Sequence, residues 1–323
     1  MGFDPRGLLE RDQGLADPSG PTEVVSPAFR RQPVRPDSVL RNVVLAGRGR
    51  CRFRHIAGPE GAPTVLLLHG WTATADLNWS PCYPALAVHY EVIAPDLRGH
   101  GGGVRGRFSL EACADDAAAL LATLGRGPSI VVGYSLGGPV ATLMWRRYPE
   151  FVAGLVLCST ASSFAETKRE HVVLSAVGSL RRAAGLVSPM GSEAWRNMLG
   201  ERWVGAGGGF AELFAGILGG HDPVALCQAA IALREYQADA WLSSISAPSA
   251  VVMTTRDHLV PPARQLQLAL SIPDCSLFRV EGDHAVCSLR PERFRKPLLA
   301  ALDDVARRSN PSSCGAIQAP MVA

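Results

Sequence analysis

The sequence predicts an α/β protein in which a mostly parallel sheet is covered by helices on both faces. Short apolar runs alternate along the chain with segments of helical periodicity, an order typical of parallel sheets. The runs are apolar throughout, as expected for strands that are buried on both faces. Between residues 162 and 240 the alternation stops and only helical periodicity remains. This interruption predicts a helical cap inserted into the α/β core.

The first half of the chain begins with a segment that has no periodicity. Residues 1–36 are rich in Pro, Arg, Asp and Gly and predict a flexible leader. Segments 39–46 and 51–56 then predict an antiparallel pair of edge strands, and buried strands are expected at 65–69 and 91–95 with a helix near residues 85–86 between them. Ser109 is placed to cap a helix over 110–124.

The second half continues the same alternation around the insertion. We expect strands at 129–133, 152–158, 250–254 and 276–280, and helices at 138–148, 264–270 and 291–308. The predicted domains are therefore a leader at 1–36, an α/β core at 37–161 and 241–308, a helical cap at 162–240 and a disordered tail at 309–323.

Composition excludes several classes of function. A net charge of +3 is too small to indicate binding to nucleic acid or to an anionic membrane surface. The chain has no run of about 18 apolar residues, so no membrane span is predicted. Its first residues include acids and lack an apolar stretch, unlike a secretory signal. The 8 cysteines contain no C-x-x-C pair, which favours buried reduced thiols in a cytoplasmic protein over a zinc site or a disulfide framework.

The segment G-Y-S-L-G at residues 133–137 is the strongest indication of chemistry. It joins a predicted strand to a predicted helix, which is the pattern of a nucleophile elbow. Gly133 and Gly137 allow a tight turn that exposes the hydroxyl of Ser135 and directs a helix N-terminus at the reaction centre. Ser135 is therefore the candidate nucleophile.

A serine hydroxyl needs an adjacent base that is itself oriented by a third group. Asp257 follows the strand at 250–254 and His284 follows the strand at 276–280. With Ser135, they would all lie at the carboxyl edge of the sheet, where open α/β sheets bind ligands. The competing position for the acid, after the strand at 152–158, has no carboxylate before Glu166.

Two neighbours of these residues receive other interpretations. Asp283 precedes the histidine directly, and its side chain should diverge from that of His284. For His258 we expect a structural role in the loop of Asp257.

The loop H-G-W at residues 69–71 follows the strand at 65–69. Gly70 would let this loop bend close to the nucleophile, and His69 would orient the loop without taking part in catalysis. The backbone N–H groups of Trp71 and Leu136 would then form an oxyanion hole.

Five segments now occur in one order: H-G-W (69–71), D-L-R-G-H-G (96–101), G-Y-S-L-G-G (133–138), D-H-L-V-P (257–261) and G-D-H (282–284). On these segments the chain resembles α/β-hydrolase fold enzymes over residues 38–308. Residues 69–79 are similar to bacterial arylesterases and cofactor-free haloperoxidases or perhydrolases, whose elbow is usually G-F-S-M-G-G. The resemblance implies an eight-stranded sheet and structural roles for Asp96, Arg98 and His100.

The predicted function is hydrolysis of a carboxylic ester through an acyl-enzyme on Ser135, with a small, partly apolar substrate and no metal or organic cofactor. The same triad of Ser135, Asp257 and His284 could serve perhydrolysis or the cleavage of a lactone, a thioester or a C–C bond. A further alternative is a non-catalytic ligand-binding protein. The bulky residues of the insertion could form core or line an acyl pocket, and the sequence leaves this open: Met190, Trp195, Met198, Trp203, Phe210 and Phe214.

Overall fold

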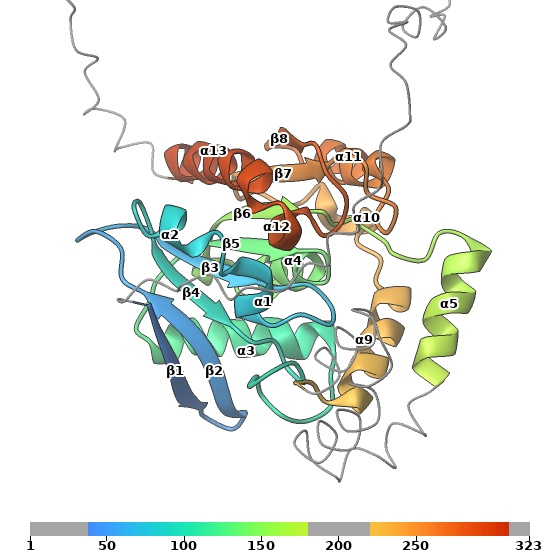
Figure 1. Ribbon diagram of the computed structural model, residues 1–323, viewed down its shortest axis with the longest axis horizontal. Helices are drawn as coiled ribbons and strands as arrows, with labels where there is room; N and C mark the ends of the chain where they lie inside the picture. The colour runs from blue at the N-terminus through green and yellow to red at the C-terminus, as the bar shows by residue number, and fades with distance from the viewer. Residues whose placement is uncertain (1–37, 180–219, 310–323) are drawn as a thin grey trace, which may run out of the picture. The chain divides into compact units, whose positions relative to one another are not determined.

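The computed structural model describes residues 38–179 and 220–309, which form an eight-stranded sheet with helices on both faces (Figure 1). The strands are β1 (Ser38–Leu45), β2 (Gly49–Ile56), β3 (Thr64–Leu68), β4 (Glu91–Pro95), β5 (Ser129–Tyr134), β6 (Val152–Cys158), β7 (Ser249–Thr254) and β8 (Cys275–Val280). Their order is β1-β2-β4-β3-β5-β6-β7-β8. Strand β2 is antiparallel to β1 and β4, and the remaining pairs are parallel. The mostly parallel sheet predicted from the apolar runs is confirmed.

The helices alternate with the strands along the chain. They are α1 (Ala75–Trp79), α2 (Tyr83–Leu86), α3 (Leu110–Thr123), α4 (Gly137–Arg147), α5 (Lys168–Ser179), α9 (Pro223–Glu235), α10 (Asp239–Leu242), α11 (Pro262–Ser271), α12 (Val286–Leu289) and α13 (Pro291–Ser309), with a 3₁₀ turn at Pro149–Phe151. The side chain of Ser109 caps α3 by accepting a hydrogen bond from the backbone N–H of Ala112 at 3.0 Å.

Two hydrophobic clusters cover the two faces of the sheet. One includes buried residues of α3 and α4, and the other includes buried residues of α1, α2, α12 and α13. All six residues of β5 are buried. Side chains of a strand point alternately to its two faces, so a strand between two helical layers needs apolar residues at every position. This burial places the end of β5, and the turn that follows it, in a rigid part of the molecule.

The described part of the insertion is helical. It contains α5 and α9, which pack against each other, and an isolated antiparallel bridge between Ser163 and Gln237 joins its two ends. Helix α10 crosses the boundary expected at residue 240. The expected leader and the bulky residues named above from Met190 to Phe214 lie outside the described residues.

The start of the tail differs by one residue from the expectation. Ser309 is the last residue of α13, because its hydroxyl donates to the carbonyls of Val305 and Ala153, at 2.8 and 2.7 Å. The second of these bonds fastens the final turn of the helix to β6. Residues 310–323 lie outside the described residues.

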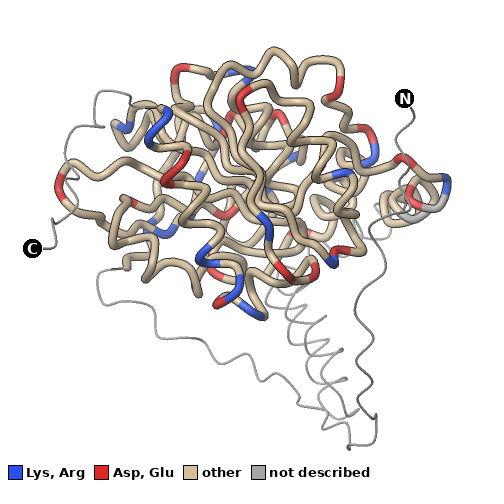
Figure 2. The backbone as a smooth tube through the Cα atoms, turned by 90° about the horizontal axis from the view of Figure 1, so that it is seen from above, with Lys and Arg blue, Asp and Glu red and all other residues tan. Residues whose placement is uncertain are grey.

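Charged residues of both signs are interspersed along the described backbone (Figure 2). Many of them form ion pairs, such as Arg98 with Asp116 at 2.7 Å. Within the described ranges, none of the helices combines the length and the apolar character that crossing a bilayer would require.

Candidate active site

Ser135 occupies the turn between β5 and α4 in a left-handed backbone conformation, with φ of 51°. Its N–H donates to the carbonyl of Cys158 at 2.9 Å, and its own carbonyl accepts from the hydroxyl of Thr160 at 2.8 Å. A left-handed conformation costs a non-glycine residue about 1–2 kcal/mol. It persists here because hydrogen bonds from β6 and the following loop hold both sides of the residue.

The two glycines of the elbow are required by close contacts. A Cβ atom on Gly133 would lie 2.3 Å from the carbonyl oxygen of Gly137, and one on Gly137 would lie 2.2 Å from the carbonyl oxygen of Leu68. The first turn of α4 therefore packs directly on the ends of β3 and β5. Only residues without a side chain allow this approach.

The imidazole of His284 lies between the other two predicted residues. Its Nε2 is 2.9 Å from the hydroxyl oxygen of Ser135, and its Nδ1 is 2.7 Å from Oδ2 of Asp257. A carboxylate is an acceptor, so Nδ1 carries the proton and Nε2 is left to accept the hydroxyl of the serine. The structure thus brings Ser135, Asp257 and His284 together.

Asp257 is buried and accepts several hydrogen bonds. Its Oδ1 accepts from the backbone N–H groups of Leu259 and Val260, both at 2.9 Å, and its Oδ2 accepts from the hydroxyl of Thr254 at 2.8 Å. Burial alone would raise the pKa of Asp257, but the hydrogen bond and charge of His284, with these other donors, hold the pKa below its usual range. The carboxyl group is therefore ionised beside the histidine.

The loop after β3 lies against Ser135. His69 is fully buried, donates from Nδ1 to the carbonyl of Gly70 and accepts at Nε2 from the N–H of Leu97, both at 2.8 Å. Burial lowers the pKa of His69, so its ring is neutral and braces the loop, the role expected from the sequence. A Cβ atom on Gly70 would lie 3.5 Å from Cβ of Ser135.

The two backbone groups expected to form an oxyanion hole flank this contact. Among the described residues, the N–H groups of Trp71 and Leu136 donate to no acceptor. Leu136 also stands at the N-terminus of α4, where the helix dipole favours negative charge.

Backbone strain gathers at the same edge of the sheet. Within the described ranges, the non-glycine residues with positive φ are Thr72, Ser135 and Ser159, at 59°, 51° and 47°. They follow β3, β5 and β6 respectively. Such strain is retained where the surroundings overdetermine it, commonly at functional sites.

The D-L-R-G-H-G segment makes contacts within its own loop and with α3. Asp96 accepts from the N–H of Gly102 at 2.9 Å, Arg98 pairs with Asp116, and His100 is fully buried. These contacts fit the structural roles that the resemblance implied.

Neither of the two neighbouring residues contacts the triad through its side chain. Asp283 is exposed and accepts a local bond from the N–H of Ala285 at 3.0 Å. His258 is also exposed, and it makes no hydrogen bond to any residue that the structure describes. The structural role expected for His258 therefore has no support.

Sequence reasoning missed three side chains around the triad. The hydroxyl of Tyr134 donates to the carbonyl of His284 at 2.8 Å, and fully buried Gln265 of α11 donates to Thr254 at 2.8 Å. Gln265 had a detectable signal: it shares the buried face of α11 with Leu268, three residues later, so a polar residue interrupts an apolar stripe.

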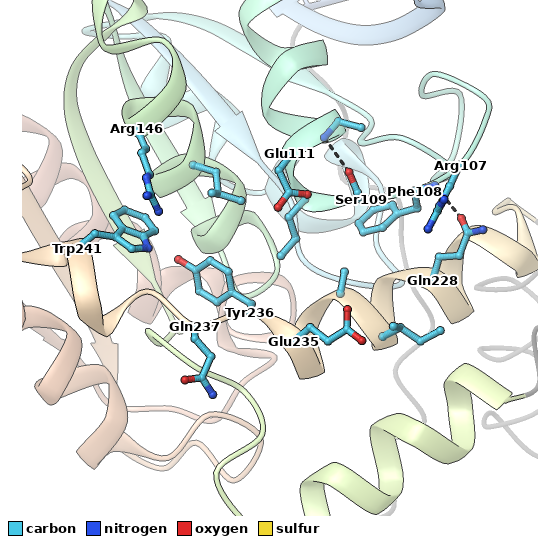
Figure 3. Close-up of a pocket in the computed structure, with 15 residues that line it drawn as sticks. Arg107, Phe108, Ser109, Glu111, Arg146, Gln228, Glu235, Tyr236, Gln237 and Trp241 are labelled. Atoms are coloured by element: carbon cyan, nitrogen blue, oxygen red, sulfur yellow. Dashed lines mark hydrogen bonds between the residues drawn. The ribbon is translucent and has the colours of Figure 1, made fainter.

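A separate pocket of about 650 Å³ lies between the N-terminus of α3, α4 and the chain from α9 to α10 (Figure 3). The guanidinium of Arg146 lies 4.9 Å from the ring centroid of Trp241 on one side of it, and Gln228 lies on the other. None of the triad residues lines this pocket. In the described part of the chain, no group of three His, Cys, Asp or Glu residues is arranged to hold a metal ion.

Comparison with known proteins identifies relatives along most of the chain. Residues 63–187 match the family model for the alpha/beta hydrolase fold. The pimeloyl-[acyl-carrier protein] methyl ester esterase of Chromobacterium violaceum is 30% identical over 250 residues, which cover 76% of this chain and 96% of the esterase. A putative carbamate hydrolase, RutD of Agrobacterium fabrum, is 29% identical over 252 residues, covering 75% and 93% of the two chains.

Solved structures agree with these relatives. A thermophilic esterase from Thermogutta terrifontis superposes with a TM-score of 0.64 at 26% identity, over 83% of this chain and 99% of the esterase. An enol-lactonase from Burkholderia xenovorans shares the fold, with a TM-score of 0.64 at 20% identity over 81% and 100%. The sheet order, the elbow and these relatives agree, and the chain therefore belongs to the α/β-hydrolase fold family and is a hydrolase of that fold.

Proposed function

We propose that this protein is a serine hydrolase that cleaves a carboxylic ester through an acyl-enzyme on Ser135. The observation that carries the proposal is the position of His284, whose Nε2 lies 2.9 Å from the hydroxyl of Ser135 while its Nδ1 lies 2.7 Å from Asp257. This is the contact pattern of a serine activated by a base that a carboxylate orients.

In the first half of the reaction, Oγ of Ser135 attacks the carbonyl carbon of the ester and its proton passes to Nε2 of His284. Asp257 keeps the proton on Nδ1 and stabilises the imidazolium that forms. The N–H groups of Trp71 and Leu136 hold the negative oxygen of the tetrahedral intermediate, and each such donor contributes about 2.7–4 kcal/mol. The intermediate then collapses, and His284 returns its proton to the departing alcohol oxygen.

In the second half, water attacks the acyl group on Ser135 while His284 accepts a proton from the water. The second intermediate releases the carboxylic acid, and the hydroxyl of Ser135 recovers its proton from His284. None of these steps requires a metal or an organic cofactor.

The relatives support an ester as the substrate class. The names of two of them, a methyl ester esterase and a putative carbamate hydrolase, denote cleavage at a carbonyl carbon. We propose a small ester with a partly apolar acyl group, and a cap function for residues 162–240. The described helices of that segment, α5 and α9, support the cap function.

The test is the Ser135→Ala variant, assayed with p-nitrophenyl acetate, butyrate and octanoate. We expect kcat to fall at least about a thousandfold, as after loss of other triad nucleophiles. Ser271→Ala, at the end of α11, is the matched control and should retain wild-type activity. Hydrolysis by Ser135→Ala at the wild-type rate would refute the assignment.

A fluorophosphonate probe separates an active serine from a non-catalytic ligand-binding protein of the same fold. Wild-type protein should be labelled at Ser135, and the absence of labelling in folded protein would favour ligand binding. A panel of lactones, thioesters, carbamates and diketones, with hydrogen peroxide as a competing nucleophile, then separates the alternative reactions of the triad.

A further inference from the structure

Two side chains outside the triad contact the same carboxylate oxygen of Asp257 as His284 does. The hydroxyl of Thr254 donates to Oδ2 at 2.8 Å, and Nε2 of Gln265 lies 3.3 Å from the same oxygen. Thr254 and Gln265 are both fully buried, and Asp257 is 3% exposed. They come from different elements, because Thr254 ends β7 and Gln265 lies in α11.

The partners of Gln265 determine the orientation of its amide. Its Oε1 accepts from the backbone N–H of Thr254 at 3.0 Å, and its Nε2 donates to the carbonyl of Val260 at 2.7 Å. A flipped amide would place a donor against a donor and an acceptor against an acceptor. Nε2 of Gln265 therefore faces Thr254, to whose hydroxyl oxygen it donates at 2.8 Å.

This orientation also directs the proton of Thr254. Its hydroxyl oxygen accepts from Gln265, and its own proton is directed to Oδ2 of Asp257 at 2.8 Å, a shorter contact than the 3.3 Å to the hydroxyl of Ser159. The result is a buried chain of hydrogen bonds that runs from Gln265 through Thr254 to Oδ2 of Asp257, the oxygen that contacts His284. Donors in such a chain polarise one another, and an unpaired member would be costly in these surroundings.

These hydrogen bonds restrict the carboxylate of Asp257 at Oδ2, the oxygen that contacts His284. Oδ1 is held separately by the backbone N–H groups of Leu259 and Val260. Rotation of the carboxylate would therefore break bonds at both oxygens. Only Oδ2 contacts His284, so its direction determines where Nε2 of the imidazole meets Ser135.

We propose that Thr254 and Gln265 are positioning residues that set the orientation of Asp257, and through it of His284, during hydrolysis. The proposal rests on the function proposed above. The alternative is that both residues only fasten the loop between β7 and α11, because Gln265 also bonds to the backbone of that loop. Replacing the hydroxyl of Thr254 while keeping the two loop bonds of Gln265 distinguishes the two roles.

The central pair of variants is Thr254→Val and Thr254→Ser. Valine keeps the shape of threonine and removes the hydroxyl, whereas serine keeps the hydroxyl. Small misplacements of catalytic groups cost up to about 100-fold in rate, so we expect Thr254→Val to lower kcat about 10- to 100-fold. KM should change less than about twofold because neither residue is placed to touch the substrate, and Thr254→Ser should restore most of kcat.

Gln265→Met removes Nε2, the first donor of this chain of hydrogen bonds, and should also lower kcat more than it changes KM. Combined with Thr254→Val, its effect should be less than additive because both act on one oxygen. Gln267→Met is the matched control: Gln267 is exposed on the same helix, and the variant should behave as wild type. If Thr254→Val does not fold, Thr254→Ala compared with Thr254→Ser carries the test, because Gln265→Met also removes the bonds that fasten the loop.

A proton NMR measurement makes the test independent of turnover. The Nδ1 proton of His284 should give a strongly downfield resonance that moves in Thr254→Val and returns in Thr254→Ser. A wild-type kcat in both Thr254→Val and Gln265→Met, or a loss of kcat that serine does not restore, would overturn the proposal. If the wild type lacks hydrolysis that depends on Ser135, the proposed function fails. In that case the positioning role is tested separately by NMR, and an Nδ1 resonance of His284 that does not move in Thr254→Val would overturn it.

Discussion

At the scale of single residues, the site combines a strained serine with several buried neutral histidines. Ser135, the proposed nucleophile, has φ of 51°, and the surrounding structure must offset the cost of this strained backbone. Three histidines next to the loop of Trp71 are also buried: His69, His100 and His221. The ring centroid of His100 lies 5.3 Å from that of His69 and 5.2 Å from that of His221. Each of these features has a measurable consequence for stability.

The strain at Ser135 should reverse the usual order of alanine and glycine. Glycine normally destabilises a structured position relative to alanine by about 0.5–1 kcal/mol, but it adopts positive φ without steric cost. We expect Ser135→Gly to unfold at a higher denaturant concentration than Ser135→Ala, with both variants inactive. Equal midpoints of unfolding in urea, or a more stable alanine variant, would show that positive φ at this position has no steric cost for a residue with a side chain.

Burial of His221 should make the protein sensitive to acid. Its Nδ1 accepts from the N–H of Gly101 at 3.2 Å, and burial lowers its pKa to about 4. The unfolded chain, with a histidine pKa near 6.5, binds more protons between these values, so the free energy of unfolding falls as pH drops from about 6.5 to about 4. His221 contributes about 3 kcal/mol to this loss.

The variant His221→Asn tests this contribution, because its amide oxygen keeps an acceptor near Gly101 and does not titrate. The free energy of unfolding should depend less steeply on pH between about 6.5 and 4 than in the wild type. His258→Asn, at an exposed position, is the control and should leave the slope unchanged. An unchanged slope in His221→Asn would contradict the assignment.

At the scale of elements, apolar runs and proline positions in the sequence predict the bounds of most strands and helices. The strands appear within two residues of their expected bounds. For the central strands β3 to β7 the reason is that an apolar run buried on both faces has few alternative conformations. The helix expected near residues 85–86 is instead two short helices, α1 and α2, separated by Ser80–Cys82, with Pro84 inside the first turn of α2. A proline is tolerated in the first turn of a helix, so it marks a second start.

The cap of α3 is the element whose stability is easiest to test. Ser109 accepts from the N–H of Ala112, and replacing such a cap with alanine costs about 1 kcal/mol. We expect Ser109→Ala to lower the free energy of unfolding in urea by this amount. Ser109→Asp should lose less, since aspartate also caps helices. An aspartate variant as unstable as the alanine variant would argue that the loss comes from elsewhere.

At the scale of the whole molecule, the core and the site share side chains. Phe294 of α13 is fully buried, with its ring centroid 5.7 Å from that of Tyr134 and 6.4 Å from that of Trp79. Tyr134 in turn donates its hydroxyl to the carbonyl of His284. The helix that covers one face of the sheet therefore supports the loop that carries the proposed base.

Phe294→Ala should remove a large part of the stability of the fold. Truncation of a buried phenylalanine costs about 3–5 kcal/mol, against a typical total of about 5–15 kcal/mol. We expect a matching drop in the free energy of unfolding by denaturant, and a smaller drop for Phe294→Leu, which leaves a smaller cavity. A loss below about 1 kcal/mol for the alanine variant would mean that the surroundings collapse into the space.

The sequence by itself determined the fold class, the elbow and the order of the three candidate residues. These depend on apolar runs and on glycine spacing, which are local. Only the tertiary structure brought Ser135 within 2.9 Å of His284 across 149 residues, and only it placed Gln265 and Thr254 against Asp257. Such contacts depend on the register of neighbouring parallel strands and on the packing of α11 against β7, and no local pattern records either.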